Sequence, residues 1–449
     1  MAKEEEQSSK GRGKVWWIWL IVLCTLGAAI SYVDRTNMGI AIVPMASDFH
    51  WTTSQQGLVL GAFFLGYLLT QALGGWLADA SVFGPHSGFL VLAMGEAAWS
   101  LFTVLTPLAA KWGLPWLVLA RVLLGVGEGI GYPAIHSLIG KMVPRKYMNG
   151  AIASTCGGCY VGGVIALLAS SPIAASEVLG WEYIFYIFGS VGALWLIPWI
   201  ALWICAPPTL CNQSSDGDKL KCWKVFFTTK RVWVLLVTSF CNGWGFWVFM
   251  SWMPTFFKAK FGTELHDLGF YSFFPYLVQG VLSFVFGFFG DWILNRQFMA
   301  LRTLRVGSQV MAMWGSGLFL MLAALTASNI YTGALHFTLS LGILALSTLG
   351  VNIAHLDLAP NHAGSLFGLL NSASVLSGVI GVPLSGLVLD WTGDNWTAVF
   401  ALTSCIYFIG SIIWICMADL TPLDFDPTPP SIESEPTKSN VVVKEEETK

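Results

Sequence analysis

Twelve apolar runs follow one another along the chain with only short polar breaks between them. A helix needs about 20 apolar residues to cross the hydrocarbon core of a bilayer, and each run approaches or exceeds that length. Only 11% of the residues are charged, whereas a soluble domain carries about 25%. The pattern predicts an all-α integral membrane protein with twelve transmembrane helices. We expect these helices at residues 16–43, 55–78, 87–108, 114–139, 147–171, 181–206, 230–257, 268–290, 302–326, 330–354, 363–389 and 394–417.

Lysine and arginine are distributed unevenly between the two sides of the predicted membrane. If both termini are cytoplasmic, 18 of them fall on the cytoplasmic side, three fall outside, and Arg35 and Arg121 fall within spans. Since positively charged loops stay in the cytoplasm, this bias predicts cytoplasmic termini. The first run lacks a small-residue cleavage site, so we interpret it as a retained helix rather than a signal peptide. We expect a multi-pass protein of the plasma membrane or an endomembrane.

The two halves of the chain repeat each other at a nearly constant spacing. Asp79 and Asp291 each close a glycine-containing span and lie 212 residues apart, and the Gly-Val-Ile triplets that begin at Gly163 and Gly378 lie 215 residues apart. Two similar spacings predict a six-helix unit present twice, an arrangement typical of transporters. The predicted organisation is an N-terminal tail (1–14), a first six-helix bundle (15–206), a linker (207–229), a second bundle (230–417) and a Pro-, Glu- and Lys-rich disordered tail (418–449).

Charged side chains inside the predicted spans are confined to the first half. A charge at mid-membrane costs about 2.5–3.5 kcal/mol on insertion scales, so each one is a functional candidate. We find no comparable charge well inside the spans of the second half. The first half is therefore predicted to hold the charge chemistry, and the second to complete a cavity. The charged residues are Asp34 and Arg35 in the first span, Glu96 in the third, and Arg121 and Glu128 in the fourth.

Arg121 and Glu128 lie seven residues apart on one helix face, a separation of about 10 Å. They are too distant to pair, so each needs a partner on another helix, a substrate or a proton. A guanidinium matches carboxylate or phosphate, and a buried glutamate can take up and release a proton. The structural alternative is that Arg35 and Arg121 only pair with Asp34 and Glu128 to hold spans 1 and 4 together. Glu96 either lines the cavity or lies near an interface.

Three other features have a structural and a functional interpretation. Glycines at 125–131 resemble a dinucleotide loop but continue an apolar helical run, so we interpret them as sites of close helix approach. Cys156 and Cys159 form a C-x-x-C, which in a soluble protein suggests zinc or redox chemistry. With no second ligand pair in a Gly-rich span, small-residue helix packing is the preferred interpretation. His136 is either a cavity residue or an interhelical one. No metal and no cofactor are predicted.

Several segments together resemble the anion:cation symporter family of the major facilitator superfamily. This family includes vesicular glutamate transporters, sialin, type I and plant-type phosphate transporters and bacterial sugar-acid carriers. The resemblance covers nearly the whole chain. Its segments are YVDRTN (32–37) with AIVPM (41–45), FFLGYLLTQ (63–71) with GGWLAD (74–79), RVLLG (121–125) with Glu128-Gly129 and Pro133-Ala134, WMPT (252–255), and DLAP (357–360) with Gly364, Gly368 and Asn371.

The resemblance implies the major facilitator fold, alternating access and roles for individual residues. It implies that Arg35 and Arg121 recognise the anion and that Asp34 and Glu128 take part in proton coupling. It also implies that Tyr67 and Asn371 line the substrate cavity, and we add His136 as a candidate there. Asp79 and Asp291 are the expected gating residues.

This chain departs from the family pattern at several positions. The basic cluster that usually follows Asp79 is absent, which puts the usual gating contact in question. Leu60 and Asn242 stand where vesicular glutamate carriers have a histidine and an arginine, which argues against glutamate as the substrate.

The predicted function is secondary active transport of a small anion. Inorganic phosphate is slightly favoured over organic carboxylates such as sugar acids, with a proton or sodium as the coupling cation. The expected partners are the anion, the cation and the bilayer, without nucleic acid, and we expect a monomer. A non-transporting sensor is disfavoured because loop 207–229 is short. An enzyme is disfavoured because His136, His336 and His355 are dispersed, and a channel because of the buried acid and the duplicated halves.

Overall fold

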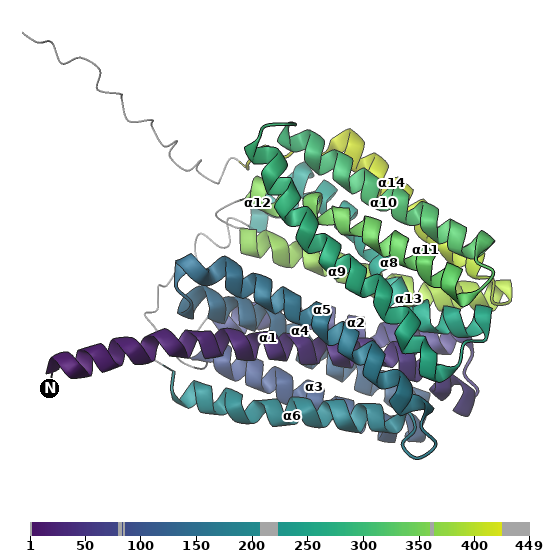
Figure 1. The fold of residues 1–449 in the computed structure, drawn as a ribbon, viewed down its shortest axis with the longest axis horizontal. Helices are drawn as coiled ribbons and strands as arrows, with labels where there is room; N and C mark the ends of the chain where they lie inside the picture. Colours follow the sequence, from purple (N-terminus) through teal and green to yellow (C-terminus); the bar gives the residue numbers. More distant parts are fainter. Residues whose placement is uncertain (1, 80–82, 84–85, 207–222, 360–362, 424–449) are drawn as a thin grey trace, which may run out of the picture.

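Long α-helices make up nearly all of the chain, as the apolar runs predict. The computed structural model describes residues 2–79, 83, 86–206, 223–359 and 363–423. Within this part, eleven helices are long and apolar enough to cross a membrane by length and composition, and α2 is a further helix of 27 residues. Residues 2–14, expected as a tail, continue the first helix (Figure 1). The helices are α1 (Ala2–Asp48), α2 (Thr53–Asp79), α3 (Ser87–Trp112), α4 (Leu114–Met142), α5 (Arg145–Ala175), α6 (Glu182–Ile204), α8 (Lys230–Phe261), α9 (Leu265–Asn295), α10 (Leu301–Thr326), α11 (Ile330–Leu344), η1 (Ala345–Leu349), α12 (Ala354–Leu358), α13 (Ala363–Thr392) and α14 (Trp396–Met417).

The helices form two bundles that lie side by side with their long axes roughly parallel (Figure 1). Helices α1–α6 form one bundle, and α8–α14 form the other. The same neighbours recur in both: α1 packs on α5 as α8 packs on α13, α2 on α4 as α9 on α11, and α3 on α6 as α10 on α14. This recurrence confirms the predicted six-helix unit that is present twice.

The two bundles meet through α1 against α8, α2 against α13 and α5 against α9. The last two pairs are equivalent under the repeat. We call the end of the molecule with the N-terminus and the turns at 143–144 and 296–300 the near end (Figure 1, N label). The far end carries the turns at 49–52, 176–181 and 262–264.

At the far end, hydrogen bonds join the bundles at both equivalent crossings. The carboxylate of Asp390 on α13 accepts a hydrogen bond from the backbone N–H of Ser54, at 2.9 Å, and another from the hydroxyl of Thr53. At the other crossing, the hydroxyl oxygen of Ser171 on α5 accepts from the N–H of Gly269 on α9 at 2.7 Å. Gly269 is required there, because an added Cβ would lie 1.9 Å from the Leu167 carbonyl oxygen. The two bundles are therefore joined at both crossings of the far end.

Glycines allow the closest contact within the first bundle, as expected from the 125–131 segment. A Cβ on Gly125 would lie 2.1 Å from the carbonyl oxygen of Phe63, and one on Gly66 would lie 1.9 Å from that of Val122. The backbones of α2 and α4 thus approach each other through reciprocal glycines. The interpretation of these glycines as sites of close helix approach is confirmed.

The predicted span 330–354 is not one regular helix. It consists of α11, the 3₁₀ turn η1, a non-helical stretch at 350–353 and the short α12. The side chain of Gln309 on α10 lies beside the break: its Oε1 accepts a hydrogen bond from the Val351 N–H at 3.0 Å. A Cβ on Gly350 would lie 2.4 Å from the same oxygen. The run was predicted as continuous because its hydropathy is unbroken, whereas a polar side chain from another helix stabilises the break.

Residues 418–423, which the sequence assigns to the start of the disordered tail, are ordered. Leu420 and Leu423 are buried, and the Leu423 N–H donates to the Leu358 carbonyl oxygen at 2.9 Å. Asp419 pairs with Arg231 at the start of α8, with 2.7 Å between Oδ2 and Nε. The predicted tail beyond 423 and most of the predicted linker 207–229 lie outside the described residues.

Candidate functional site

A buried ion pair joins α1 and α4 in the first bundle. Nη2 of Arg35 donates to Oε2 of Glu128 at 2.9 Å, and the two side chains are 4% and 0% exposed. Glu128 therefore does have a partner on another helix, as expected. The partner is Arg35 on α1, so this pair joins spans 1 and 4 in the way that the structural alternative describes.

Aromatic rings surround the Arg35 guanidinium. Its carbon lies 4.6 Å from the ring centres of Tyr32 and Tyr67 and 5.0 Å from that of Phe63. Trp247 on α8, in the second bundle, lies 5.5 Å away. Ring faces attract a cation, and the attraction is strongest where water is excluded. The charge is thus held at the junction of the two bundles, and Tyr67 is part of this site through its ring.

Arg121 is buried close by but has unused hydrogen-bond donors. It is 2% exposed, and its Nε and Nη1 have no hydrogen-bond partner among the described residues. Its guanidinium carbon lies 5.5 Å from the ring centre of Phe63. With Arg35, Met250 and Ser251 it lines a small cavity of about 10 Å³ between the bundles, room for about one water molecule.

The two remaining buried acids differ in position. Asp34 is 1% exposed and makes no hydrogen bond of good geometry to the described residues. Glu96 is fully buried on α3 and faces α6, where a Cβ on Gly192 would lie 3.0 Å from its Oε1. Glu96 therefore lies at the contact between α3 and α6 and does not line either of the cavities described here.

A larger cavity lies between the bundles next to Arg35. It has a volume of about 150 Å³, and five helices, α1, α4, α5, α8 and α9, contribute to its wall. Its lining is mainly aromatic and sulfur-containing, with hydroxyl groups as the principal polar groups. The lining residues are Tyr32, Thr36, Tyr132, Cys156, Cys159, Tyr160, Gly163, Phe246, Met250 and Tyr276. We call it the central cavity.

Two predicted substrate residues are not among the lining residues of these cavities. His136 is half-buried between α4 and α13, with its ring centre 5.3 Å from Tyr132 and 6.1 Å from Phe367. Asn371 on α13 is half-buried and is not among the lining residues of either cavity. Asp79 and Asp291 lie near the ends of α2 and α9, and their side chains fall outside the described part of the structure.

The cysteine pair faces the central cavity, which corrects its interpretation as a helix-packing feature. Glycines of the same helix make the close contact with α1: a Cβ on Gly158 would lie 2.5 Å from the Thr25 carbonyl oxygen, and one on Gly162 would lie 2.1 Å from that of Ala29. Cys156 and Cys159 lie in the cavity wall instead. The segment contains both cysteines and glycines. The rotation of α5 about its axis decides which of them face the cavity and which face α1.

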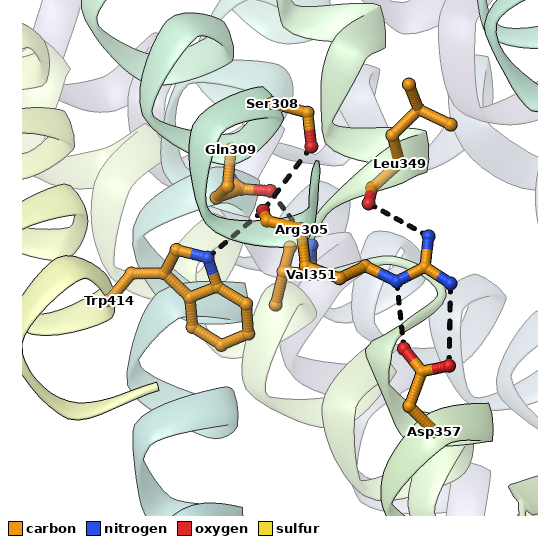
Figure 2. Close-up of polar contacts among 7 residues, drawn as sticks. All are labelled: Arg305, Ser308, Gln309, Leu349, Val351, Asp357 and Trp414. Carbon is orange, nitrogen blue, oxygen red and sulfur yellow. Dashed lines mark hydrogen bonds and ion pairs between the residues drawn. The ribbon is translucent and has the colours of Figure 1, made fainter. Parts of the chain in front are cut away.

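A second ion pair, between a buried arginine and a partly buried aspartate of the second bundle, was missed from the sequence (Figure 2). Arg305 on α10 is 5% exposed and pairs with Asp357 on α12 through two nitrogens, at 2.8 and 3.4 Å. Its Nη1 donates to the Leu349 carbonyl oxygen at 3.1 Å, and its own carbonyl oxygen accepts from Trp414 at 3.3 Å. Arg305 lies near the start of α10, and only charges well inside the spans were considered from the sequence. Its place inside the predicted span 302–326 was the available signal.

Among the described residues, no cluster of three or more His, Cys, Asp or Glu side chains is suited to a metal ion.

Comparison with known proteins gives matches over most of the chain. Residues 24–382 match the Major Facilitator Superfamily. The ascorbate transporter, chloroplastic, of Arabidopsis thaliana is 33% identical over 421 residues, which cover 89% of this chain and 75% of that protein. The sodium-dependent phosphate transport protein 1, chloroplastic, of the same plant is 34% identical over 419 residues, 89% of this chain and 80% of that protein.

The fold is also similar to solved transporter structures. A bacterial homologue of the human lysosomal transporter Spinster superposes with a TM-score of 0.75 at 19% identity, over 93% of this chain and 99% of that one.

Proposed function

The chain belongs to the Major Facilitator Superfamily, in its anion:cation symporter group, and is a transporter rather than an enzyme; on that premise we propose that it carries a small organic anion together with a proton. The observation that supports this most strongly is the arrangement at the junction of the bundles. Arg35 is held by Glu128 and by aromatic rings from both bundles, and Arg121 beside it has unused donors. An unpaired buried donor is costly, so an entering anion gains from filling it.

The Arg35–Glu128 pair is our reason for proposing a proton as the coupling ion. While Glu128 is ionised, it occupies the Arg35 guanidinium. Protonating Glu128 removes the charge that holds Arg35, so that both arginines become available to one anion. Losing the proton restores the pair and expels the anion. Proton and anion are thus bound together and released together, which is symport. Asp34, buried and without a good hydrogen bond nearby, is the second proton-carrying candidate.

The central cavity favours an organic anion over phosphate. An apolar cavity of about 150 Å³ is large enough for a benzene-sized ring, and ligand sites are mostly apolar with a few placed polar groups. Tyrosine and phenylalanine rings suit a flat or ring-shaped body, while the arginines suit its charged end. The named ascorbate transporter is a relative whose substrate has this form.

Inorganic phosphate, favoured by the sequence, is the second candidate. The two arginines that line one small cavity provide the positive charge a phosphate needs, and a named phosphate transporter is a comparably similar relative. Sodium, which that name implies, is the alternative coupling ion.

For topology, we propose that the near end is cytoplasmic. The bias of lysine and arginine places both termini there. For location, the plasma membrane or an endomembrane stays a prediction, and the relatives' chloroplast names make the plastid envelope the alternative.

The first experiment is counterflow in proteoliposomes, because it needs no knowledge of the coupling ion. Vesicles loaded with excess unlabelled ascorbate or phosphate are diluted into the matching tracer, with gluconate and benzoate as external competitors. We expect transient accumulation of ascorbate that organic anions compete and phosphate does not. Phosphate counterflow without ascorbate counterflow would reverse the choice between the two candidates.

Coupling is tested on the same vesicles without sodium. An inwardly directed proton gradient should drive uptake above equilibrium. Uptake that responds only to sodium would contradict the role of Glu128.

A further inference from the structure

The two cysteines of the C-x-x-C motif converge on one point in the wall of the central cavity. The hydroxyl oxygen of Tyr132 on α4 lies 3.6 Å from the sulfur of Cys156 and 3.6 Å from that of Cys159. Both sulfurs are therefore within reach of a single small group. Cys156 is exposed and Cys159 is buried, and both line the cavity.

The spacing of the thiols favours a bridging atom over a direct disulfide. Residues three apart on a helix have Cβ atoms about 5–6 Å apart, whereas a disulfide needs about 3.5–4.5 Å. Joining the sulfurs directly would thus deform α5. A soft ion with metal–sulfur bonds of about 2.3 Å spans the wider gap without deformation.

The residues that line the central cavity also favour a thiophilic ligand. Thiolate and thioether ligands select soft ions, and the thioether of Met250, from the other bundle, lines the same cavity. Because no third His, Cys, Asp or Glu joins the pair within the described residues, a four-ligand zinc site is disfavoured. An ion that needs only two thiols is the better fit.

We propose that Cys156 and Cys159 form a vicinal dithiol site that binds one soft, thiophilic metal or metalloid ion, with trivalent arsenic as the type case, and that an occupied site stops transport. With phenylarsine oxide, the two thiols add to arsenic. Both arsenic–oxygen bonds break, two arsenic–sulfur bonds form, and the two thiol protons leave with the oxygen as water. No oxidant is needed. The bound group fills the cavity between the bundles, so they cannot close around a substrate.

Binding is tested without any transport assay. Intact mass spectrometry of the full chain in detergent counts arsenicals retained after a wash with excess monothiol, in a background that carries C205S, C211S and C222S to remove competing thiols. We expect one phenylarsenic group per chain, removed by 2,3-dimercaptopropanol. Because the second thiol acts at high effective concentration, C156S or C159S should weaken retention by about 100-fold. C241S, a buried cysteine of α8, is the matched control and should retain the group.

A second measurement covers the case in which a serine variant fails to fold. In the unsubstituted pair, bound arsenical should protect Cys156 and Cys159 together from alkylation, as read by peptide mapping. Retention by C156S equal to that of the parent, or protection of neither cysteine, would overturn the site.

The effect on transport rests on the proposed function and is measured separately, as tracer counterflow. The arsenical should stop flux in the parent, and dimercaptopropanol should restore it. C156S, whatever its untreated flux, should keep nearly all of that flux when the arsenical is added. Flux that continues in vesicles whose protein carries the group overturns the block. If no tested anion is transported, the proposed function fails, while the mass measurement still decides the site.

Discussion

The two ion pairs built on the buried arginines Arg35 and Arg305 use the same chemistry for different purposes. Arg305 and Asp357 are fully engaged: two nitrogens reach the carboxylate, a third reaches a backbone carbonyl, and the Arg305 carbonyl accepts from Trp414 (Figure 2). In the Arg35–Glu128 pair, a single hydrogen bond joins the partners, and Nε of Arg35 and Oε1 of Glu128 have no partner in the described structure.

The difference teaches what each pair is suited to do. A buried ion pair is stable when further hydrogen bonds satisfy its remaining atoms. The Arg305 pair meets this condition and joins the broken helix α11–η1–α12 to α10. The Arg35 pair does not meet it, and its unused atoms lie where the bundles meet. One pair is suited to hold structure, and the other to exchange partners.

The largest expected effect is on folding, from Arg305→Ala. Removing one partner of a fully buried pair costs about 3–5 kcal/mol of stability; Asp357 is partly exposed, so this range is the upper limit for the pair, and the change also frees the Leu349 carbonyl. Thermal unfolding of the purified protein in detergent should show a large loss, with the double variant R305A/D357A less affected than R305A. A well-folded R305A protein would show that the satisfied pair is not structural.

Next is Arg121→Ala, which should act on transport and not on folding. A hydrogen bond to a charged group contributes about 1.5–3 kcal/mol, so counterflow at low substrate concentration should fall by about 10- to 100-fold. Arg231→Ala, at the surface, is the control. Unchanged counterflow with R121A would remove Arg121 from the anion site.

Glu128→Gln should leave the exchange of substrate across the membrane intact but remove its coupling to the proton gradient. The amide resembles the protonated acid, so Arg35 stays free for the anion and counterflow should persist, while uptake driven by a proton gradient is lost. Asp357→Gln, in the pair of Asp357 with Arg305, is the control. It should change counterflow and proton-driven uptake to the same extent. If E128Q still accumulates substrate against its gradient, the proton is carried elsewhere, and Asp34 becomes the next candidate.

Asp390→Asn should weaken the contact between the bundles at the far end by a smaller amount. The carboxylate of Asp390, in the second bundle, accepts hydrogen bonds from Thr53 and Ser54 at the start of α2, in the manner of a helix N-cap. Losing such a cap costs about 1 kcal/mol. Opening at the far end should become about fivefold more frequent, measured as faster labelling of a cysteine placed at Ser54. Asp394→Asn in the adjacent turn is the control and should leave the labelling rate unchanged.

The smallest effect concerns the exposed pair of Asp419 and Arg231. The pKa of Asp419 lies below its ordinary value, because the Thr421 backbone N–H, the Thr421 hydroxyl and Arg231 stabilise its charged form. Because folding lowers the pKa of Asp419, its charge stabilises the folded state at pH values above the ordinary pKa of an aspartate. This stabilisation is lost as the pH falls through the lowered pKa of the folded state. Asp419→Asn should therefore lower thermal stability at pH 7 by less than about 1 kcal/mol, with the difference vanishing in acid. An equal difference at both pH values would contradict this origin.

Much of the fold was predictable because it depends on local composition. Long apolar runs can only satisfy their backbone groups in lipid as helices, so the spans and the repeat follow from hydropathy. The glycines of α4 and the buried positions of Arg35, Arg121 and Glu128 were predictable for the same reason. The break after Leu344 was not, since Gln309, far away in sequence, stabilises it.

The sequence by itself determined that this chain is a duplicated helical membrane protein with charges at mid-depth in its first half. Only the tertiary structure decided that Glu128 pairs with Arg35, 93 residues away, and that Cys156 and Cys159 face a cavity while Gly158 and Gly162 face α1. The physical reason is that hydropathy fixes which segments leave water. The rotation of each helix and its partners depend on side-chain packing between segments that are distant in the chain.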